Sequence, residues 1–230
     1  MKDLFAGVRH FRQNVFHTQQ ELFQELSQGQ APQTLFITCS DSRVNPNLIT
    51  HTDPGDLFVI RNAGNLVPAY GVPTGGEEAT IEFALQALGV RHIVICGHSG
   101  CGAMKGLLTP EALTEMPSVA RWLRHAEATR RLVKAKYPEV SGDDLLRVAT
   151  EENVLTQIEN LQTHPAVAVA MAKDSLSIHA WVYEIASGDV RAYDVQEGVF
   201  KPLGENVRPA AGNTPRRVFD VRGGDSLFGV

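Results

Sequence analysis

The sequence predicts a single α/β domain built on a mostly parallel central sheet. Short, nearly continuous apolar segments at residues 34–38, 57–61 and 92–96 have the composition of strands that are buried on both faces. An amphipathic segment at residues 75–88 separates the last two and predicts a crossover helix, the connection that parallel strands require. This alternation of strands and helices favours an α/β fold over an all-β or all-α one.

The other elements extend the sheet and cover it. An amphipathic helix is predicted at residues 3–27, ended by Gly29 and Pro32. Periodicity and the bounding turn residues then predict helices at 103–108, 117–136 and 143–162, followed by a hairpin at 177–185 and 190–195. We therefore expect about four parallel strands plus an edge strand, flanked by helices.

The 230 residues fit one well-buried domain, with no repeat or linker to divide them. Residues 1–30 are interpreted as an N-terminal helical arm, 31–203 as the core and 204–230 as an irregular tail. The apolar stripe of the long first helix must be buried, either on its own domain or on a partner subunit. Its sequence alone leaves both options open.

Composition excludes several classes of protein. The net charge is −5, from 21 basic and 26 acidic residues, which argues against nucleic acid or an anionic membrane surface as the main partner. No apolar segment approaches the ~20 residues of a membrane span, and the charged N-terminus lacks the apolar stretch of a signal peptide. A cytoplasmic location is expected, and the odd set of three cysteines argues against a disulfide framework.

Two of the predicted strands end in polar side chains of the same kinds. Cys39, Asp41 and Arg43 follow the first strand, and His98 and Cys101 follow the strand at 92–96 on a glycine-rich turn. If these strands are parallel neighbours, their carboxyl ends lie at one edge of the sheet, where α/β proteins bind ligands. Each residue alone has an ordinary structural interpretation, such as packing, capping or a solvated charge. Together they favour a site.

Two thiolates and one imidazole suit zinc, and three protein ligands leave a fourth tetrahedral position open, as in catalytic zinc sites. Such a site lowers the pKa of a bound water to ~7. Asp41, held ionised by a bidentate pair with Arg43, is suited to orient that water, and it could instead swing onto the metal. Cys96 lies within its strand and is interpreted as buried packing.

At these residues the chain resembles the β-class carbonic anhydrases. The family carries Cys-x-Asp-x-Arg followed by His-x-x-Cys, matched by Cys39-Ser-Asp41-Ser-Arg43 and His98-Ser-Gly-Cys101, and residues 54–65 resemble its second core segment. The resemblance runs to about residue 203. It implies zinc-dependent reversible hydration of carbon dioxide to bicarbonate and a proton, by attack of zinc-bound hydroxide. It also implies a homodimer, or a higher assembly of dimers, with the first helix packed on the partner.

By position, the resemblance assigns the substrate pocket to Gln30, Phe58, Ala63, Phe83 and Gly102, with Gln30 donating a hydrogen bond across the dimer. One subgroup of the family has an inactive form in which the aspartate ligates zinc, and it carries tryptophan three residues before the first cysteine. Phe36 occupies that position, so we expect the open, active form. Bacterial members act free in the cytoplasm, in carboxysomes or beside cyanate breakdown, and the sequence does not choose among these settings.

Three other functions fit the residues less well. A cysteine-dependent hydrolase with His98 as base leaves one cysteine unused. A zinc-dependent dehydrogenase needs a Gly-x-Gly-x-x-Gly turn, but Lys105 follows Gly100-Cys-Gly102 where the third small residue should fall. A zinc-stabilised, non-catalytic binding or scaffold module makes no use of Asp41 and Arg43. The hydratase accounts for all of the site residues.

Overall fold

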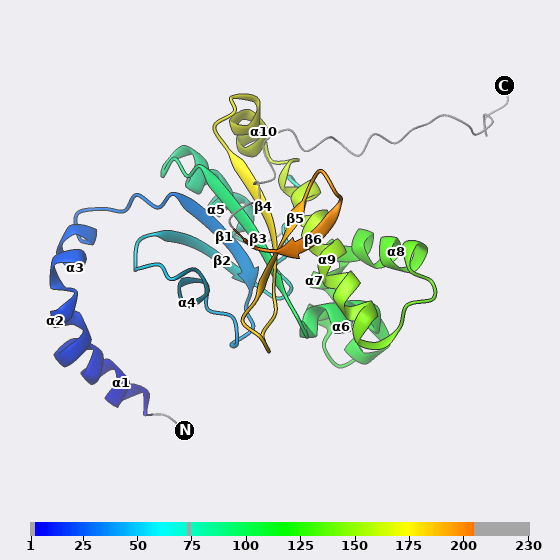
Figure 1. Ribbon diagram of the computed structural model, residues 1–230, viewed down its shortest axis with the longest axis horizontal. Helices are drawn as coiled ribbons and strands as arrows, with labels where there is room; N and C mark the ends of the chain where they lie inside the picture. Colours follow the sequence, from blue (N-terminus) through cyan, green and yellow to red (C-terminus); the bar gives the residue numbers. More distant parts are fainter. Residues whose placement is uncertain (1–2, 73–74, 205–230) are drawn as a thin grey trace.

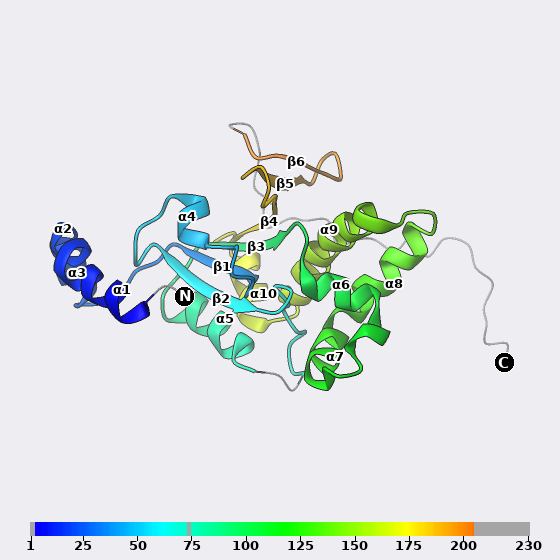
Figure 2. The same ribbon diagram turned by 90° about the horizontal axis from the view of Figure 1, so that it is seen from below.

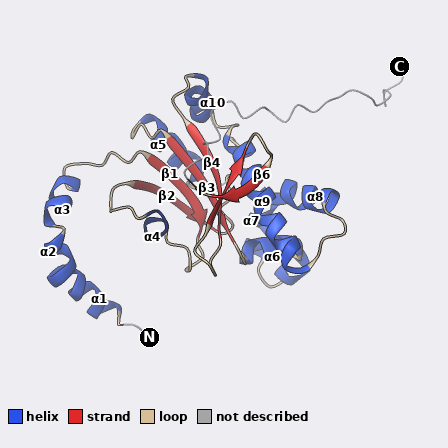
Figure 3. Cartoon of the chain, in the orientation of Figure 1, coloured by secondary structure: helices blue, strands red, loops and turns tan. Residues whose placement is uncertain are grey.

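The computed structural model describes residues 3–72 and 75–204 of the chain. Within these residues one sheet has the strand order β2-β1-β3-β4-β5-β6 (Figures 1 and 3). Its strands are Thr34–Cys39 (β1), Leu57–Asn62 (β2), His92–His98 (β3), Ser177–Tyr183 (β4), Val190–Asp194 (β5) and Val199–Pro202 (β6). Strands β1 to β4 are mutually parallel, and β5 pairs antiparallel with β4 on one side and with β6 on the other. The mostly parallel sheet is therefore confirmed.

Helices cover the sheet on both faces. They are Pro46–Thr50 (α4), Glu77–Gln86 (α5), Gly102–Leu108 (α6), Pro117–Leu123 (α7), Glu127–Lys136 (α8), Gly142–Leu161 (α9) and Pro165–Ala172 (α10). Figure 2 shows α5 and α10 on one face of the sheet and α4 on the other. Helix α9 packs against β3 and β4, and α6, α7 and α8 form a helical layer beside it (Figure 1).

The central strands β1 and β3 are buried on both faces, and successive side chains of each strand point to opposite sides. Leu35 and Ile37 of β1 face α5, α9 and α10, and both are fully buried. Phe36, between them, packs on the other face with Val94 and Cys96, so the interpretation of Cys96 as buried packing is confirmed. This burial on both faces explains why Leu35, Phe36 and Ile37 are all apolar, whereas the buried hydroxyl of Thr38 donates to the carbonyl of Cys96 at 2.8 Å.

The N-terminal arm is not the single continuous helix that its periodicity predicts. It consists of Leu4–His10 (α1), a π-helical turn at Phe11–Val15, Phe16–Thr18 (α2) and Gln20–Leu26 (α3), with a break at Gln19. Three aromatic rings account for this irregular path: Phe16 stacks on Phe23 with ring centroids 5.3 Å apart, and Phe11 contacts both edge-on. The arm extends away from the rest of the chain (Figures 1 and 2).

Four further features differ from the sequence-based expectation. The predicted helix at 117–136 is divided into α7 and α8 by a 3₁₀ turn at Arg124–Ala126. Strand β6 lies between the predicted hairpin and the predicted tail, where no strand was expected, and α4 and α10 were not anticipated. The predicted tail at 204–230 lies outside the described residues except for Gly204.

Candidate metal centre

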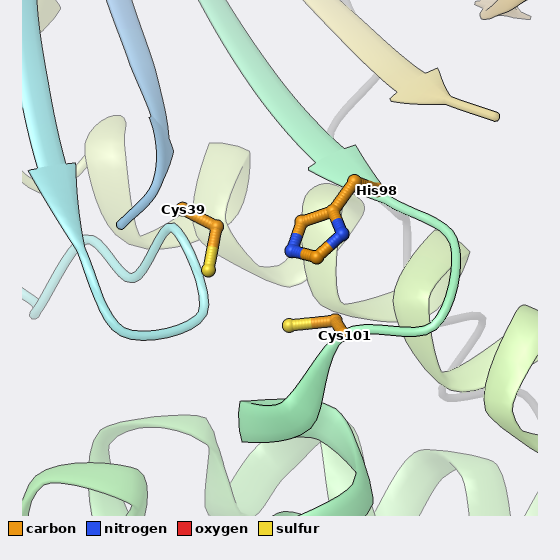
Figure 4. Close-up of side chains that lie close together, drawn as sticks. All are labelled: Cys39, His98 and Cys101. Carbon is orange, nitrogen blue, oxygen red and sulfur yellow. The ribbon is translucent and has the colours of Figure 1, made fainter. Parts of the chain in front are cut away.

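The sheet places the sequence-predicted ligands at one edge. β1 and β3 are parallel neighbours, with Thr38 opposite Cys96, so both strands end at the same side of the sheet. Cys39 is the last residue of β1, His98 is the last residue of β3, and Cys101 caps the start of α6. Figure 4 shows the three side chains pointing toward a common point.

The geometry of these three residues fits a metal ion. One ligand atom from each of Cys39, His98 and Cys101 lies within 4.8 Å of the others, and all three residues are buried. His98 Nδ1 lies 3.0 Å from the carbonyl oxygen of Ser99, which can only accept, so Nδ1 carries the proton and Nε2 presents its lone pair. His98 Nε2 is buried and makes no hydrogen bond among the described residues. A bound metal ion would give this buried nitrogen the partner that it lacks.

The two thiols of the site are electrostatically unequal. The hydrogen bond from Cys101 lowers the pKa of Cys39, with further help from His98 and from the N–H of Gly64, while burial opposes the shift. The same hydrogen bond, together with burial, raises the pKa of Cys101. Ionisation of one sulfur therefore opposes ionisation of the other when no cation is present. A divalent cation would remove this opposition, because it stabilises both thiolates at once.

Asp41 lies beside the ligand set and is held by Arg43. Arg43 Nε and Nη2 donate to the two carboxylate oxygens at 2.9 and 2.7 Å, and the Arg43 backbone N–H donates to Oδ1 at 3.0 Å. These bonds hold the pKa of Asp41 well below its ordinary value. Asp41 Oδ2 lies 3.8 Å from His98 Nε2. The predicted ionised carboxylate is thus present, with both oxygens engaged by the guanidinium.

Sequence reasoning missed two groups that shape the site. Arg61, near the end of β2, donates to the carbonyl oxygens of Cys39 and Asp41 at 3.1 and 2.8 Å and so fixes the path of the ligand segment. The N–H of Gly64 lies 3.4 Å from Cys39 Sγ. The signal for Arg61 was available, because β2 pairs with β1 and delivers its last residues to the same edge. A backbone donor such as Gly64 leaves no signal in the residue type.

The predicted substrate-pocket residues fall into two groups. Ala63 precedes Gly64, and Gly102 follows Cys101, so both lie near the ligand set. Phe58 contacts Phe83 with ring centroids 6.0 Å apart, and Phe83 is 49% exposed.

The second group lies away from the ligands of its own chain. Phe58 comes four residues before Asn62, the partner of Cys39 in β2, which places it roughly 13 Å along the strand from that edge. Gln30 is exposed in the segment before β1. This segment enters β1 at the end opposite to Cys39 (Figure 1). The structure does not bring Gln30, Phe58 and Phe83 to the ligands of the same chain.

Comparisons with known proteins agree with this site. Residues 34–190 match the family model described as carbonic anhydrase. The chain is 54% identical to a carbonic anhydrase of Synechocystis sp. over 84% of this chain and 71% of the relative. The solved structure of the β-carbonic anhydrase CcaA superposes with a TM-score of 0.85 at 52% identity, covering 87% of this chain and 98% of that one. A tetrameric β-carbonic anhydrase of Sordaria macrospora superposes with a TM-score of 0.75 at 29% identity, covering 86% and 96%.

The chain therefore belongs to the carbonic anhydrase family, in its β class. It is an enzyme of carbon dioxide hydration, and its Cys-His-Cys cluster has the donor set of a zinc enzyme. The hydrolase, dehydrogenase and scaffold alternatives are not supported. Among the described residues, no helix has the length and apolar character that a membrane crossing needs.

Proposed function

We propose that this chain hydrates carbon dioxide with a zinc ion held by Cys39, His98 and Cys101. The observation that carries the proposal is the buried, unpartnered Nε2 of His98 facing two cysteine sulfurs at the edge of the sheet. Three ligands leave a fourth position free for the reaction. When bound, zinc supplies a nucleophile at neutral pH by lowering the pKa of water to ~7.

Asp41 orients that nucleophile. Its carboxylate is ionised across the working pH range because Arg43 lowers its pKa, so it acts as a hydrogen-bond acceptor. By accepting a hydrogen bond at Oδ2 from the O–H of the attacking oxygen, Asp41 would turn a lone pair of that oxygen toward the carbon of carbon dioxide. One water and one carbon dioxide then give bicarbonate and a proton. Gly102 is exposed beside Cys101, and in this proposal its N–H donates to an oxygen of the substrate.

The structure favours the open form of the site. Both carboxylate oxygens of Asp41 are bound by Arg43, and a swing onto the metal would have to break this bidentate pair. Phe36 is fully buried against Trp181, with ring centroids 6.0 Å apart. The expectation that Phe36 accompanies an active enzyme at neutral pH is part of the same proposal. A structure near pH 7.5 with Asp41 bound to zinc would contradict it.

A homodimer completes the substrate pocket in this proposal. The first helix exposes Leu4, Phe5 and Val8 by 79, 78 and 68%, an apolar surface that a partner subunit would cover. Because Gln30, Phe58 and Phe83 lie away from the ligands of their own chain, we assign them to the site of the partner. Ala63 and Gly102 serve the site of their own chain. Tetrameric relatives are compatible with further assembly of dimers.

A mixed dimer tests the assignment of Gln30. One chain carries Cys101→Ser and the other carries Gln30→Ala, each with its own affinity tag. If Gln30 acts across the dimer, the chain with intact Cys101 receives an intact Gln30 from its partner, and the mixed dimer has about half of the parent rate. If Gln30 acts within its own chain, neither site is complete and the mixed dimer is no faster than the Gln30→Ala homodimer. The second result rejects the assignment.

Zinc content and hydration rate test the metal site together. Stopped-flow carbon dioxide hydration at pH 8 is measured on the parent, on Cys101→Ser and on Cys96→Ala, with zinc assayed per chain. We expect about one zinc per chain and fast hydration in the parent and in Cys96→Ala, since Cys96 is buried in the sheet away from the ligands. Cys101→Ser should lose both. Bound zinc without hydration in the parent, across pH 7 to 9, would refute the open site.

A cytoplasmic location belongs to the same proposal. It is supported by three buried, free cysteines, which persist in a reducing compartment. No contact among the described residues favours association with a carboxysome or with cyanate breakdown.

A further inference from the structure

The loop that follows β2 places a backbone donor against the Cys39 sulfur. Gly64 N–H points at Cys39 Sγ across 3.4 Å, and this contact is buried (the loop passes beside Cys39 in Figure 4). Gly64 has φ +86°, and a Cβ there would come within 3.0 Å of the Ala103 side chain. The loop therefore lies tightly against the start of α6, and only glycine fits at this position.

An indole fixes the peptide that carries this donor. The Gly64 N–H belongs to the same planar peptide unit as the carbonyl of Ala63. Trp122 Nε1 donates to that carbonyl at 2.8 Å. Because the unit is rigid, holding its oxygen from α7 also sets the direction of its N–H toward Cys39. The two hydrogen bonds polarise the peptide in the same sense, so each strengthens the other.

A buried amide holds the next peptide of the loop. Asn153 of α9, only 1% exposed, donates from Nδ2 to the carbonyl of Gly64 at 3.0 Å. Its own Oδ1 accepts from Gln157 Nε2 at 3.0 Å and from Thr129 Oγ1 at 3.4 Å. Gln157 Oε1 in turn accepts from the N–H of Val67 at 2.8 Å. These residues form a satisfied network with no exposed member to yield to water.

We propose that Trp122 and Asn153 are positioning residues for the Cys39 sulfur: they act through the Ala63–Gly64–Asn65 backbone to keep one N–H···S hydrogen bond on a ligand of the metal site. An N–H···S bond withdraws electron density from the thiolate, which keeps the bound metal a strong Lewis acid and favours the thiolate over the thiol. The inference rests on the proposed zinc site. It adds that α7 and α9, which are distant in sequence from Cys39, control the electron density on the sulfur of that ligand.

Two substitutions remove the two anchors. Trp122→Phe keeps a ring and deletes the N–H donor, and Asn153→Leu keeps a similar volume and deletes the amide. Loss of a group that supports a metal ligand typically weakens metal binding by roughly 10- to 100-fold. We expect the zinc Kd, measured by competition with a chelator at one pH, to rise within that range for Asn153→Leu and less for the partly exposed Trp122→Phe. Because both act on one hydrogen bond, the double variant should fall short of the product of the single effects.

A spectroscopic readout separates positioning from mere stability. In the Co²⁺-substituted protein, loss of the N–H···S bond raises the energy of the sulfur lone pairs, so the sulfur-to-cobalt charge-transfer band should move to longer wavelength in both variants. Thr156→Val is the matched control, because Thr156 is buried on the same helix and its hydroxyl bonds to the carbonyl of Glu152 at 2.9 Å. It should change neither the band nor the zinc Kd, whatever it does to the melting temperature.

The outcomes are distinct from those that test the zinc site itself. A parent protein that binds no zinc would overturn the proposed function. A parent that binds zinc, with the charge-transfer band and zinc Kd unchanged in Trp122→Phe and Asn153→Leu, would overturn the positioning role alone. If Asn153→Leu fails to fold, Trp122→Phe decides by the same two measurements, since it leaves the buried network intact.

Discussion

Gly97, which precedes His98 at the end of β3, lies close against α9. A Cβ at this position would lie 2.9 Å from Val154 Cγ2 and 3.0 Å from Thr150 Cγ2. Ordinary contacts between such carbons are 3.5–4.0 Å, so Gly97→Ala requires α9 to move away from β3 by several tenths of an ångström or more. Both neighbours are buried and β-branched, so neither can turn aside at low cost.

The size of the effect follows from overpacking. Forcing an extra carbon into a well-packed core typically costs about 1–3 kcal/mol. For a chain of this length, 1 kcal/mol corresponds to roughly 2–4 °C in melting temperature, so Gly97→Ala should melt roughly 2–12 °C below the parent. The measurement is urea and thermal unfolding of the zinc-loaded protein at one fixed concentration, since unfolding of a dimer depends on concentration.

A double-mutant cycle identifies the cause. In a Val154→Ala background the added Cβ occupies space that the valine methyl has vacated, so Gly97→Ala should cost less there, while the close contact with Thr150 remains. The coupling energy should be favourable and between about 0.5 and 3 kcal/mol, the range for residues in contact. An equal cost in both backgrounds, or a cost below about 0.5 kcal/mol in the parent, would refute the reasoning.

Two further predictions concern charged groups. Arg43→Gln should lower the hydration rate at pH 8 by roughly 10- to 100-fold and raise the pKa of Asp41, because the bidentate pair is lost. Arg43→Lys keeps the charge without the bidentate geometry and should retain an intermediate rate. A parent-like rate in Arg43→Gln would show that the orientation of Asp41 is unimportant. Burial, with the nearby His92, lowers the pKa of His179 to about 4. The unfolded chain therefore binds a proton there between about pH 6.5 and 4 that the folded chain does not, so falling pH destabilises the fold in this window. His179→Gln should flatten the decline of unfolding free energy over that range, and an unchanged slope would contradict this origin.

The convergence of the three candidate ligands could be predicted because each of them lies where a strong local signal ends. Cys39 and His98 close two apolar strands, and parallel pairing alone then brings them to one edge. Asp41 and Arg43 follow within the same segment, so their pairing needed no long-range information. Residue type and spacing were sufficient wherever the chemistry belongs to side chains next to a strand end.

The features that the sequence did not predict have no such local signal. Helix α10 is uniformly apolar, so it offers no period by which to recognise it, and the break of the arm at Gln19 follows from aromatic contacts among Phe11, Phe16 and Phe23 rather than from a turn residue. The contact between Asn153 and Gly64 joins residues 89 apart in sequence and involves a backbone carbonyl. The identity of neither residue predicts this hydrogen bond.

Helix α9 connects the stability of the fold to the proposed metal site. Thr150 and Val154 face Gly97 at the sheet, and Asn153, adjacent to Val154, holds the Gly64 carbonyl at 3.0 Å. A shift of the helix that relieves a Cβ at position 97 must also move Asn153 relative to the loop, because one rigid helix carries all three side chains. Hydrogen bonds weaken quickly as they lengthen, so the outward shift should loosen the Gly64 peptide and with it the N–H···S bond to Cys39. Gly97→Ala is therefore expected to weaken zinc binding as well as folding, although residue 97 itself ligates nothing.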